Sequence, residues 1–127
     1  MERLLLVCLG GALGSGARYL VSGWVIARTG TGFPWGTWCV NVAGSFLLSA
    51  IMRLALTTDW ISPTAQLTLT VGVLGGFTTY STFNYEVLAS LEQGAWLTAG
   101  ADVLLTVVGC LAAGLLGQAF ARLATGA

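Results

Sequence analysis

The order of apolar and polar residues divides the chain into four long apolar runs with short polar linkers between them. The runs cover about residues 4–27, 35–57, 65–91 and 95–122. A run of about 20 apolar residues is long enough to cross a bilayer as an α-helix. The linkers, such as RTGTGFP and EQG, consist largely of turn-forming residues. The pattern therefore predicts an all-α membrane protein with four transmembrane helices in a single domain, residues 1–127.

Composition supports this interpretation and excludes several classes of protein. Of the 127 residues, 56% are hydrophobic and only 8% are charged, whereas about a quarter of the residues in a soluble domain are charged. The first run contains Arg18 and is too long for the apolar region of a signal peptide, so we expect it to remain as a helix. The net charge is zero and the arginines are scattered, which excludes nucleic acid as a partner.

An even number of spans predicts that both termini lie on one side of the membrane. Arg3, Arg53 and Arg122 fall on that side and Arg28 on the other. So slight a bias leaves the orientation undecided by the positive-inside rule, and the chain is therefore permitted to insert both ways.

Four helices enclose little interior, so a transport function favours a dimer. Gly10 with Gly14, and Gly72 with Gly76, have the GxxxG spacing of closely packed membrane helices. These pairs are candidate dimer interfaces.

Polar residues inside the spans need an explanation. A charge at the bilayer centre costs about 2.5–3.5 kcal/mol on insertion scales, so Arg18, Glu86 and Asp102 each require a partner, an interfacial depth or a wet cavity. Asn41 lies in the motif WGTWCVNVAGSF, where its amide would be unsatisfied in lipid. It either makes a structural hydrogen bond between helices or donates to a pathway.

The segment GGFTTYSTFNYE, residues 75–86, concentrates polarity in the third run. Its glycines and threonines are poor helix formers, so we predict a helix break near residues 75–79. A break frees carbonyl oxygens, which are ligands for a small hard cation such as Na⁺. Beyond the break, Tyr80 and Phe83 share a helical face, with Ser81 and Thr82 beside them. Electropositive ring edges, hydroxyls and an amide together suit a small hard anion.

Other candidate chemistry is weaker. Thr106 and Cys110 are four residues apart and share a helical face in the fourth run, but most threonines of membrane helices bond back to their own helix. Cys8, Cys39 and Cys110 have no metal-site spacing, and the chain contains no His. No nucleophile has a recognisable base nearby, so we do not expect an enzyme.

These residues resemble a known family, the Fluc (CrcB) fluoride ion channels. The likeness covers nearly the whole chain through GGALGSGARY, WGTWCVNVAGSF and GGFTTYSTFNYE. It implies a four-helix subunit of the bacterial inner membrane that inserts in both orientations and forms an antiparallel homodimer. Two narrow pores along the subunit interface would passively export fluoride with strong selectivity over chloride.

The resemblance also implies roles for individual residues. Matched by motif, the fluoride pore would be lined by Asn41, Tyr80, Ser81, Thr82, Phe83, Thr106 and Cys110, with Arg18 at its vestibule. The backbone carbonyls of Gly75 and Thr78 would bind a structural Na⁺ on the dimer axis. Two positions depart from the family pattern: Tyr80 stands where Phe is usual, and Cys110 replaces a hydroxyl.

Two other functions fit a chain of this size. A small multidrug exporter also has four helices, but that mechanism needs a carboxylate in the first span, where the charge is Arg18. A non-transporting membrane scaffold would use the same polar core only to fix the packing of its helices.

Overall fold

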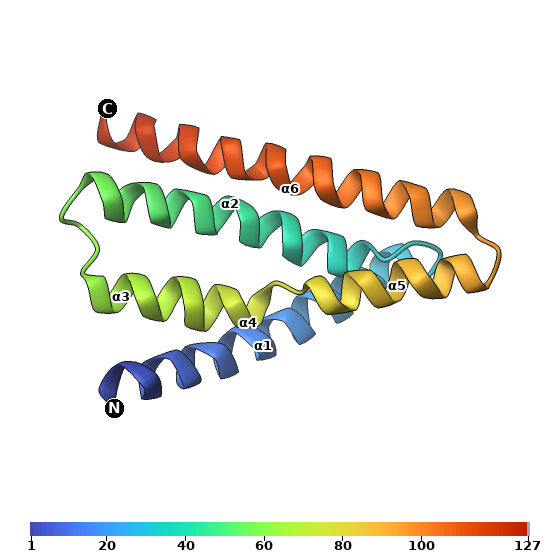
Figure 1. The fold of residues 1–127 in the computed structure, drawn as a ribbon, viewed down its shortest axis with the longest axis horizontal. Coiled ribbons are helices and arrows are strands. Elements are labelled where there is room, and N and C mark those ends of the chain that lie inside the picture. The colour runs from blue at the N-terminus through green and yellow to red at the C-terminus, as the bar shows by residue number, and fades with distance from the viewer. Residues whose placement is uncertain (127) are drawn as a thin grey trace.

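A computed structural model describes residues 1–126, and these residues form helices without strands (Figure 1). The elements are α1 (Glu2–Thr29), α2 (Trp35–Thr57), α3 (Pro63–Leu67), the π-helix η1 (Thr68–Leu74), α4 (Gly75–Phe77), α5 (Tyr80–Glu92) and α6 (Trp96–Thr125). Together α3, η1, α4 and α5 make up the third span. The architecture is therefore that of an all-helical membrane protein.

The observed helices follow the predicted spans closely. The second has the predicted ends. The first extends two residues beyond the predicted run 4–27 at each end, and the fourth begins one residue after and ends three residues after the predicted run 95–122. Of the described helices, α1, α2 and α6 are each long and apolar enough to cross a membrane. The third span is divided into shorter pieces, none of which has the necessary length alone.

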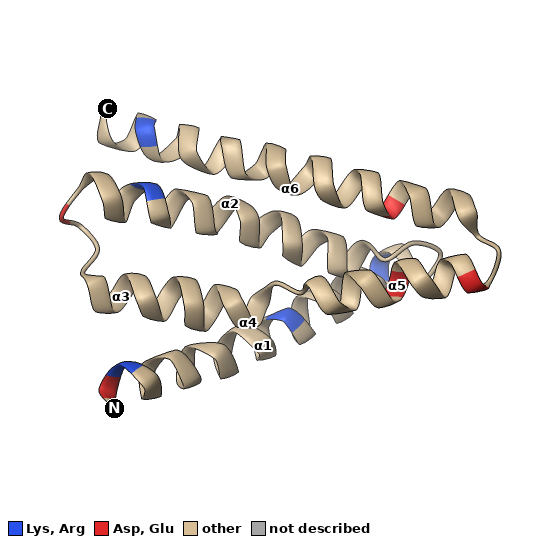
Figure 2. Cartoon of the chain, in the orientation of Figure 1, with Lys and Arg blue, Asp and Glu red and all other residues tan. Residues whose placement is uncertain are grey.

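The path of the chain places both termini at one end of the bundle (Figure 1). The α2–α3 loop lies at the same end, and the α1–α2 and α5–α6 turns lie at the other. Basic residues are found toward both ends (Figure 2). The expectation that an even number of spans brings the termini together is confirmed.

Glycines allow α1 to pack directly on the backbone of the third span. A Cβ added at Gly10 would lie 3.2 Å from the Cα of Gly72, and one added at Gly14 or Gly76 would meet backbone atoms of the opposite element. The prediction that these glycine pairs form a dimer interface is wrong. They lie inside the subunit, because close backbone approach is needed between α1 and the third span.

The third span breaks at Thr78 and Thr79, within the predicted range 75–79. Both residues have extended backbone angles, with φ −86° and ψ 158° at Thr78 and φ −152° and ψ 116° at Thr79. The span begins at Pro63, whose N-cap Ser62 accepts a hydrogen bond from the Ala65 amide. The prediction of a broken third helix is confirmed.

The π-helix η1 before the break was not predicted. The hydroxyls of Thr68 and Thr70 donate to the carbonyls of Thr64 and Gln66, four residues earlier, at 2.9 and 2.8 Å. Such bonds compete with the α-helical ladder and loosen it. Single turns of π-helix are frequent at functional sites.

Candidate functional site

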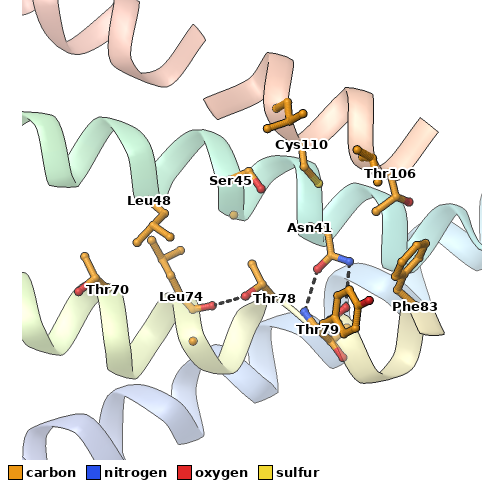
Figure 3. A pocket seen from close by; sticks show the side chains of 15 residues that line it. Asn41, Ser45, Leu48, Thr70, Leu74, Thr78, Thr79, Phe83, Thr106 and Cys110 are labelled. Carbon is orange, nitrogen blue, oxygen red and sulfur yellow. Dashed lines mark hydrogen bonds between the residues drawn. The ribbon is translucent and has the colours of Figure 1, made fainter. Parts of the chain in front are cut away.

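Asn41 bridges the broken backbone of the third span. Its Nδ2 donates to the carbonyl of Thr79 at 3.0 Å, and the Thr79 amide donates to its Oδ1 at 2.8 Å (Figure 3). Asn41 and Thr79 are each only 8% exposed. One side chain of α2 therefore satisfies both backbone groups of the residue at which the helix breaks.

The break removes the usual helical donors from the carbonyls that precede it, among them those of Gly75 and Thr78. In a continuous helix the Thr79 amide would donate to the Gly75 carbonyl, and the Thr82 amide to the Thr78 carbonyl. Here the Thr79 amide donates to Asn41, and the Thr82 amide donates to Thr79 Oγ1 at 3.2 Å. The carbonyls of Gly75 and Thr78 therefore lack the amide donors that a continuous helix would give them. Among the described residues no group of three or more His, Cys, Asp and Glu side chains could hold a metal.

A cavity, here called the central groove, lies where α2, α6 and the break meet. It has a volume of about 460 Å³, and its walls include Ser45, Leu48, Leu74 and Leu111. The predicted site residues on its walls are Asn41, Gly75, Thr78, Tyr80, Phe83, Thr106 and Cys110 (Figure 3). The structure thus brings together most of the side chains that the sequence singled out.

The two aromatic residues of the central groove contact each other through an edge. The rings of Tyr80 and Phe83 have centroids 5.7 Å apart and an interplanar angle of 60°. Phe83 is 8% exposed, whereas Tyr80 is 79% exposed in the single chain. The prediction that they share a face is confirmed, and the Tyr80 ring is left for contact with something outside the subunit.

Arg18 and Thr82 lie in a second cavity, here called the side groove, of about 720 Å³. Thr37, Thr79 and Glu86 also line it. Thr79 therefore borders both grooves, so the break lies between them. Ser81 is exposed and lines neither groove, although its hydroxyl lies 3.4 Å from that of Thr79.

Two acidic residues inside the helical bundle, half-buried Glu86 and buried Asp102, have hydroxyl partners. Thr37 Oγ1 donates to Glu86 Oε1 at 2.8 Å, and Thr106 Oγ1 donates to Asp102 Oδ1 at 3.1 Å. Thr106 thus donates its hydroxyl hydrogen to Asp102 and not toward the central groove. Neither Thr37 nor Thr79 was assigned to the site from the sequence. Thr37 lies four residues before Asn41 on α2, and this spacing indicates that the two side chains share one polar face of the helix.

The fold and the site define a class of protein. It is a small helical membrane protein in which a side chain of one helix, Asn41, bonds the broken backbone of the third span beside two grooves. A family model described as "CrcB-like protein, Camphor Resistance (CrcB)" matches residues 5–118. The chain belongs to this family.

Relatives are similar over nearly their whole length. A protein of Anaeromyxobacter dehalogenans is 60% identical over 113 residues, which cover 89% of this chain and 90% of the relative. Proteins of Sorangium cellulosum and Geobacter metallireducens are 51% and 48% identical over 122 residues, which cover 96% of this chain and 96% and 98% of the relatives. Each of the three is named a fluoride-specific ion channel FluC.

Proposed function

We propose that the chain is a fluoride-selective channel of the bacterial inner membrane that passively exports fluoride from the cytoplasm. Its relatives are named fluoride-specific ion channels, and such proteins are channels rather than enzymes. The observation that carries the proposal is the break at Thr79, held by Asn41 between two grooves and followed by the edge-contacting rings of Tyr80 and Phe83.

The residues around the break suit a small anion that is tightly hydrated in water. An amide nitrogen has two hydrogens, and Asn41 uses one on the Thr79 carbonyl. The second is then a donor for fluoride. Ring edges of Tyr80 and Phe83 add positive electrostatic potential without a fixed charge. Cys110 is the weakest donor among the residues assigned to the pore.

Arg18 supplies the positive charge of the proposed pathway. It lines the side groove with Thr82, while Ser81 lies beside the Thr79 hydroxyl at the boundary between the grooves. A cation at the entrance of the proposed pathway raises the local concentration of anions there. We assign Arg18 to the vestibule, and Thr82 and Ser81 to the polar wall near the break.

The proposed assembly is an antiparallel homodimer with two pores. The single chain leaves its central groove open and the Tyr80 ring 79% exposed, and a second copy of the chain would cover both. Copies inserted in opposite orientations are compatible with the slight bias of arginines between the two ends.

Insertion in both orientations is tested by labelling the C-terminal end. A cysteine placed at Gly126, in a chain whose three native cysteines are replaced by serine, is expected to react with an impermeant maleimide in about half the copies from either face of the membrane. Labelling from a single face would refute dual topology.

A structural Na⁺ is the proposed cofactor of this dimer. The carbonyls of Gly75 and Thr78 have lost their helical donors, and carbonyl oxygens are hard ligands that suit Na⁺. Two oxygens from each subunit would give four ligands on the dimer axis. The ion would supply a fixed positive charge between the pores.

Fluoride efflux from liposomes tests the proposed function. Vesicles loaded with KF and containing the purified protein should release fluoride rapidly after valinomycin is added, and vesicles loaded with KCl should release no chloride. Phe83→Ile removes the ring edge and is expected to slow fluoride release about tenfold or more. Absence of fluoride release from inserted wild-type dimers would favour a non-transporting scaffold, and chloride release would refute selectivity.

A further inference from the structure

Trp38 makes a hydrogen bond between helices that the proposed pore does not use. The residue is half-buried near the start of α2, and its indole Nε1 donates to the backbone carbonyl of Leu105 on α6 at 3.0 Å. A tryptophan near the end of a membrane span usually directs its N–H to water or to lipid headgroups. The indole of Trp38 bonds the backbone of a neighbouring helix instead, so its orientation requires an explanation.

Gly109 leaves the space that the indole occupies. Within α6 the Leu105 carbonyl already has a donor, the Gly109 amide four residues later. A Cβ added at Gly109 would lie 3.3 Å from Trp38 Nε1 and 3.5 Å from its Cζ2. Because Gly109 has no side chain, the indole can approach α6 and share this carbonyl oxygen.

Two further aromatic rings fix the orientation of the indole. The rings of Trp35 and Trp38 meet edge to face, with centroids 5.7 Å apart and an interplanar angle of 89°. The ring of Phe33 packs on that of Trp35 at a centroid distance of 4.5 Å. Aromatic pairs of this geometry are favourable beyond the area that they bury. Rings of the α1–α2 loop and of the first turn of α2 therefore direct the indole N–H toward α6.

The neighbours of Trp38 on α2 hold the elements that border the two grooves. Thr37 donates to Glu86 of α5 at 2.8 Å. Asn41 bonds both backbone groups of Thr79 at the break. With the bond from Trp38, about one turn of α2 contacts α5, the break and α6 through side-chain hydrogen bonds.

The bonded carbonyl lies next to the α6 wall of the central groove. Leu105 directly precedes Thr106, and Cys110 follows four residues after Thr106 on the same helical face. Thr106 and Cys110 both line the groove, together with Asn41. A rotation or shift of α6 at Leu105 would therefore move both side chains relative to Asn41.

The other contacts between α2 and α6 do not depend on the indole. A Cβ added at Gly117, about two turns beyond Gly109, would meet the backbone carbonyl of Phe46, and Ala121 is fully buried. Small residues thus keep the two backbones close along the rest of α6. The helices should stay packed without the bond from Trp38, so this bond sets the local position of α6 rather than its association with α2.

We propose that Trp38 is a positioning residue of the central groove. Its bond to Leu105 holds α6 in the position at which Thr106 and Cys110 line the anion path. The inference rests on the proposed channel function, because a path of fixed width distinguishes fluoride from the larger chloride ion. Without the indole N–H, α6 samples other positions, the groove widens and chloride passes.

The reactivity of Cys110 tests the position of α6 independently of transport. In a parent chain whose Cys8 and Cys39 are replaced by serine, Cys110 is labelled with methyl methanethiosulfonate, a small uncharged reagent, well below the unfolding temperature. Trp38→Phe keeps an aromatic ring but removes the donor. Because one hydrogen bond changes an equilibrium by about two- to tenfold, the labelling rate should rise by about threefold or more. A rate equal to that of the parent, including no reaction in either protein, would refute the proposal.

Gly109→Ala distinguishes loss of the bond from loss of the indole ring. The new methyl would lie 3.3 Å from Nε1 and push the intact indole away from the carbonyl, so the labelling rate should rise here too. The ring of Trp38→Phe lacks both atoms that this methyl would meet, so the double variant should label no faster than Trp38→Phe alone. Rate effects that multiply in the double variant would contradict a shared bond. Trp60→Phe, an exposed ring in the α2–α3 loop, is the control and should label at the parent rate.

Ion release from liposomes tests the effect on selectivity. Vesicles loaded with KCl and containing Trp38→Phe should release chloride at least about threefold faster than vesicles with the wild type or with Trp60→Phe. A loss of stability alone would reduce fluoride release without admitting chloride. If labelling changes as expected but the wild type releases no fluoride, only the channel function fails. If the wild type conducts fluoride and Trp38→Phe still excludes chloride, the effect on selectivity is refuted.

Discussion

Replacing Asn41 with alanine is expected to destabilise the protein strongly and to abolish conduction. The change leaves the amide and the carbonyl of Thr79 without their partners at the break. Each unsatisfied buried group costs about 1–3 kcal/mol, so the free energy of unfolding should fall by about 2–6 kcal/mol. This is a large part of the stability of a typical domain, about 5–15 kcal/mol. Thermal unfolding in detergent and fluoride efflux from liposomes measure the two effects.

The control for this substitution is Gln93→Ala. Gln93 is an exposed amide residue in the turn between α5 and α6, away from the break, so its loss should leave both measurements near the wild-type values. If Asn41→Ala unfolds at the wild-type temperature, Asn41 does not hold the break.

A comparison of the wild type with Asn41→Ala also tests the proposed Na⁺ site. Exchange of Na⁺ for a bulky organic cation should lower the unfolding temperature of the wild-type dimer. It should have no effect on Asn41→Ala, because that variant no longer diverts the Thr79 amide from the Gly75 carbonyl. An unfolding temperature of the wild type that does not depend on the cation would refute the site.

Gly14→Ala is expected to disrupt the contact between α1 and the third span. The added carbon would meet the backbone carbonyl of Val73 and the amide of Phe77, neither of which can move as a flexible side chain does. Overpacking of this kind costs about 1–3 kcal/mol or more. The loss exceeds the gain of about 1 kcal/mol or less from replacing a helical glycine with alanine.

Gly16→Ala provides the control within the same helix. A Cβ at Gly16 meets no atom within 4 Å, so only the gain in helix propensity should remain. Thermal unfolding of the two variants in the same detergent should therefore shift in opposite directions. Equal shifts would show that α1 can move away from the third span without cost.

Span length and the position of the break were predictable because they depend on local composition. The apolar runs are long enough to cross a bilayer, and the segment from Gly75 to Thr79 has poor helix propensity. The partner of the break was not predictable, since nothing in the spacing states that Asn41 on one helix reaches Thr79 on another. The sequence is compatible with both interpretations of Asn41, and the observed bonds to Thr79 establish the interhelical hydrogen bond.

Other features depend on packing that the sequence does not specify. A GxxxG pair indicates close helix contact but not whether the neighbouring helix belongs to the same subunit, so Gly10 and Gly14 were assigned to the wrong interface. Thr106 lies on the wall of the central groove. Its hydroxyl donates to Asp102, and this partner could not be predicted without the positions of the side chains. The assignments of residues to the pore remain predictions.

The pairing between Asn41 and Thr79 also limits how the gene can change over time. It ties a position in the second helix to one in the third, and the intervening helical residues determine whether the two meet. Insertion or deletion of a single residue within α2 after Asn41, or within the third span before Thr79, would rotate one partner away from the other by about 100°. The α2–α3 loop, residues 58–62, joins the two helices outside these stretches. Length variation among homologues should therefore concentrate in that loop, while the helical segments on either side retain a constant number of residues.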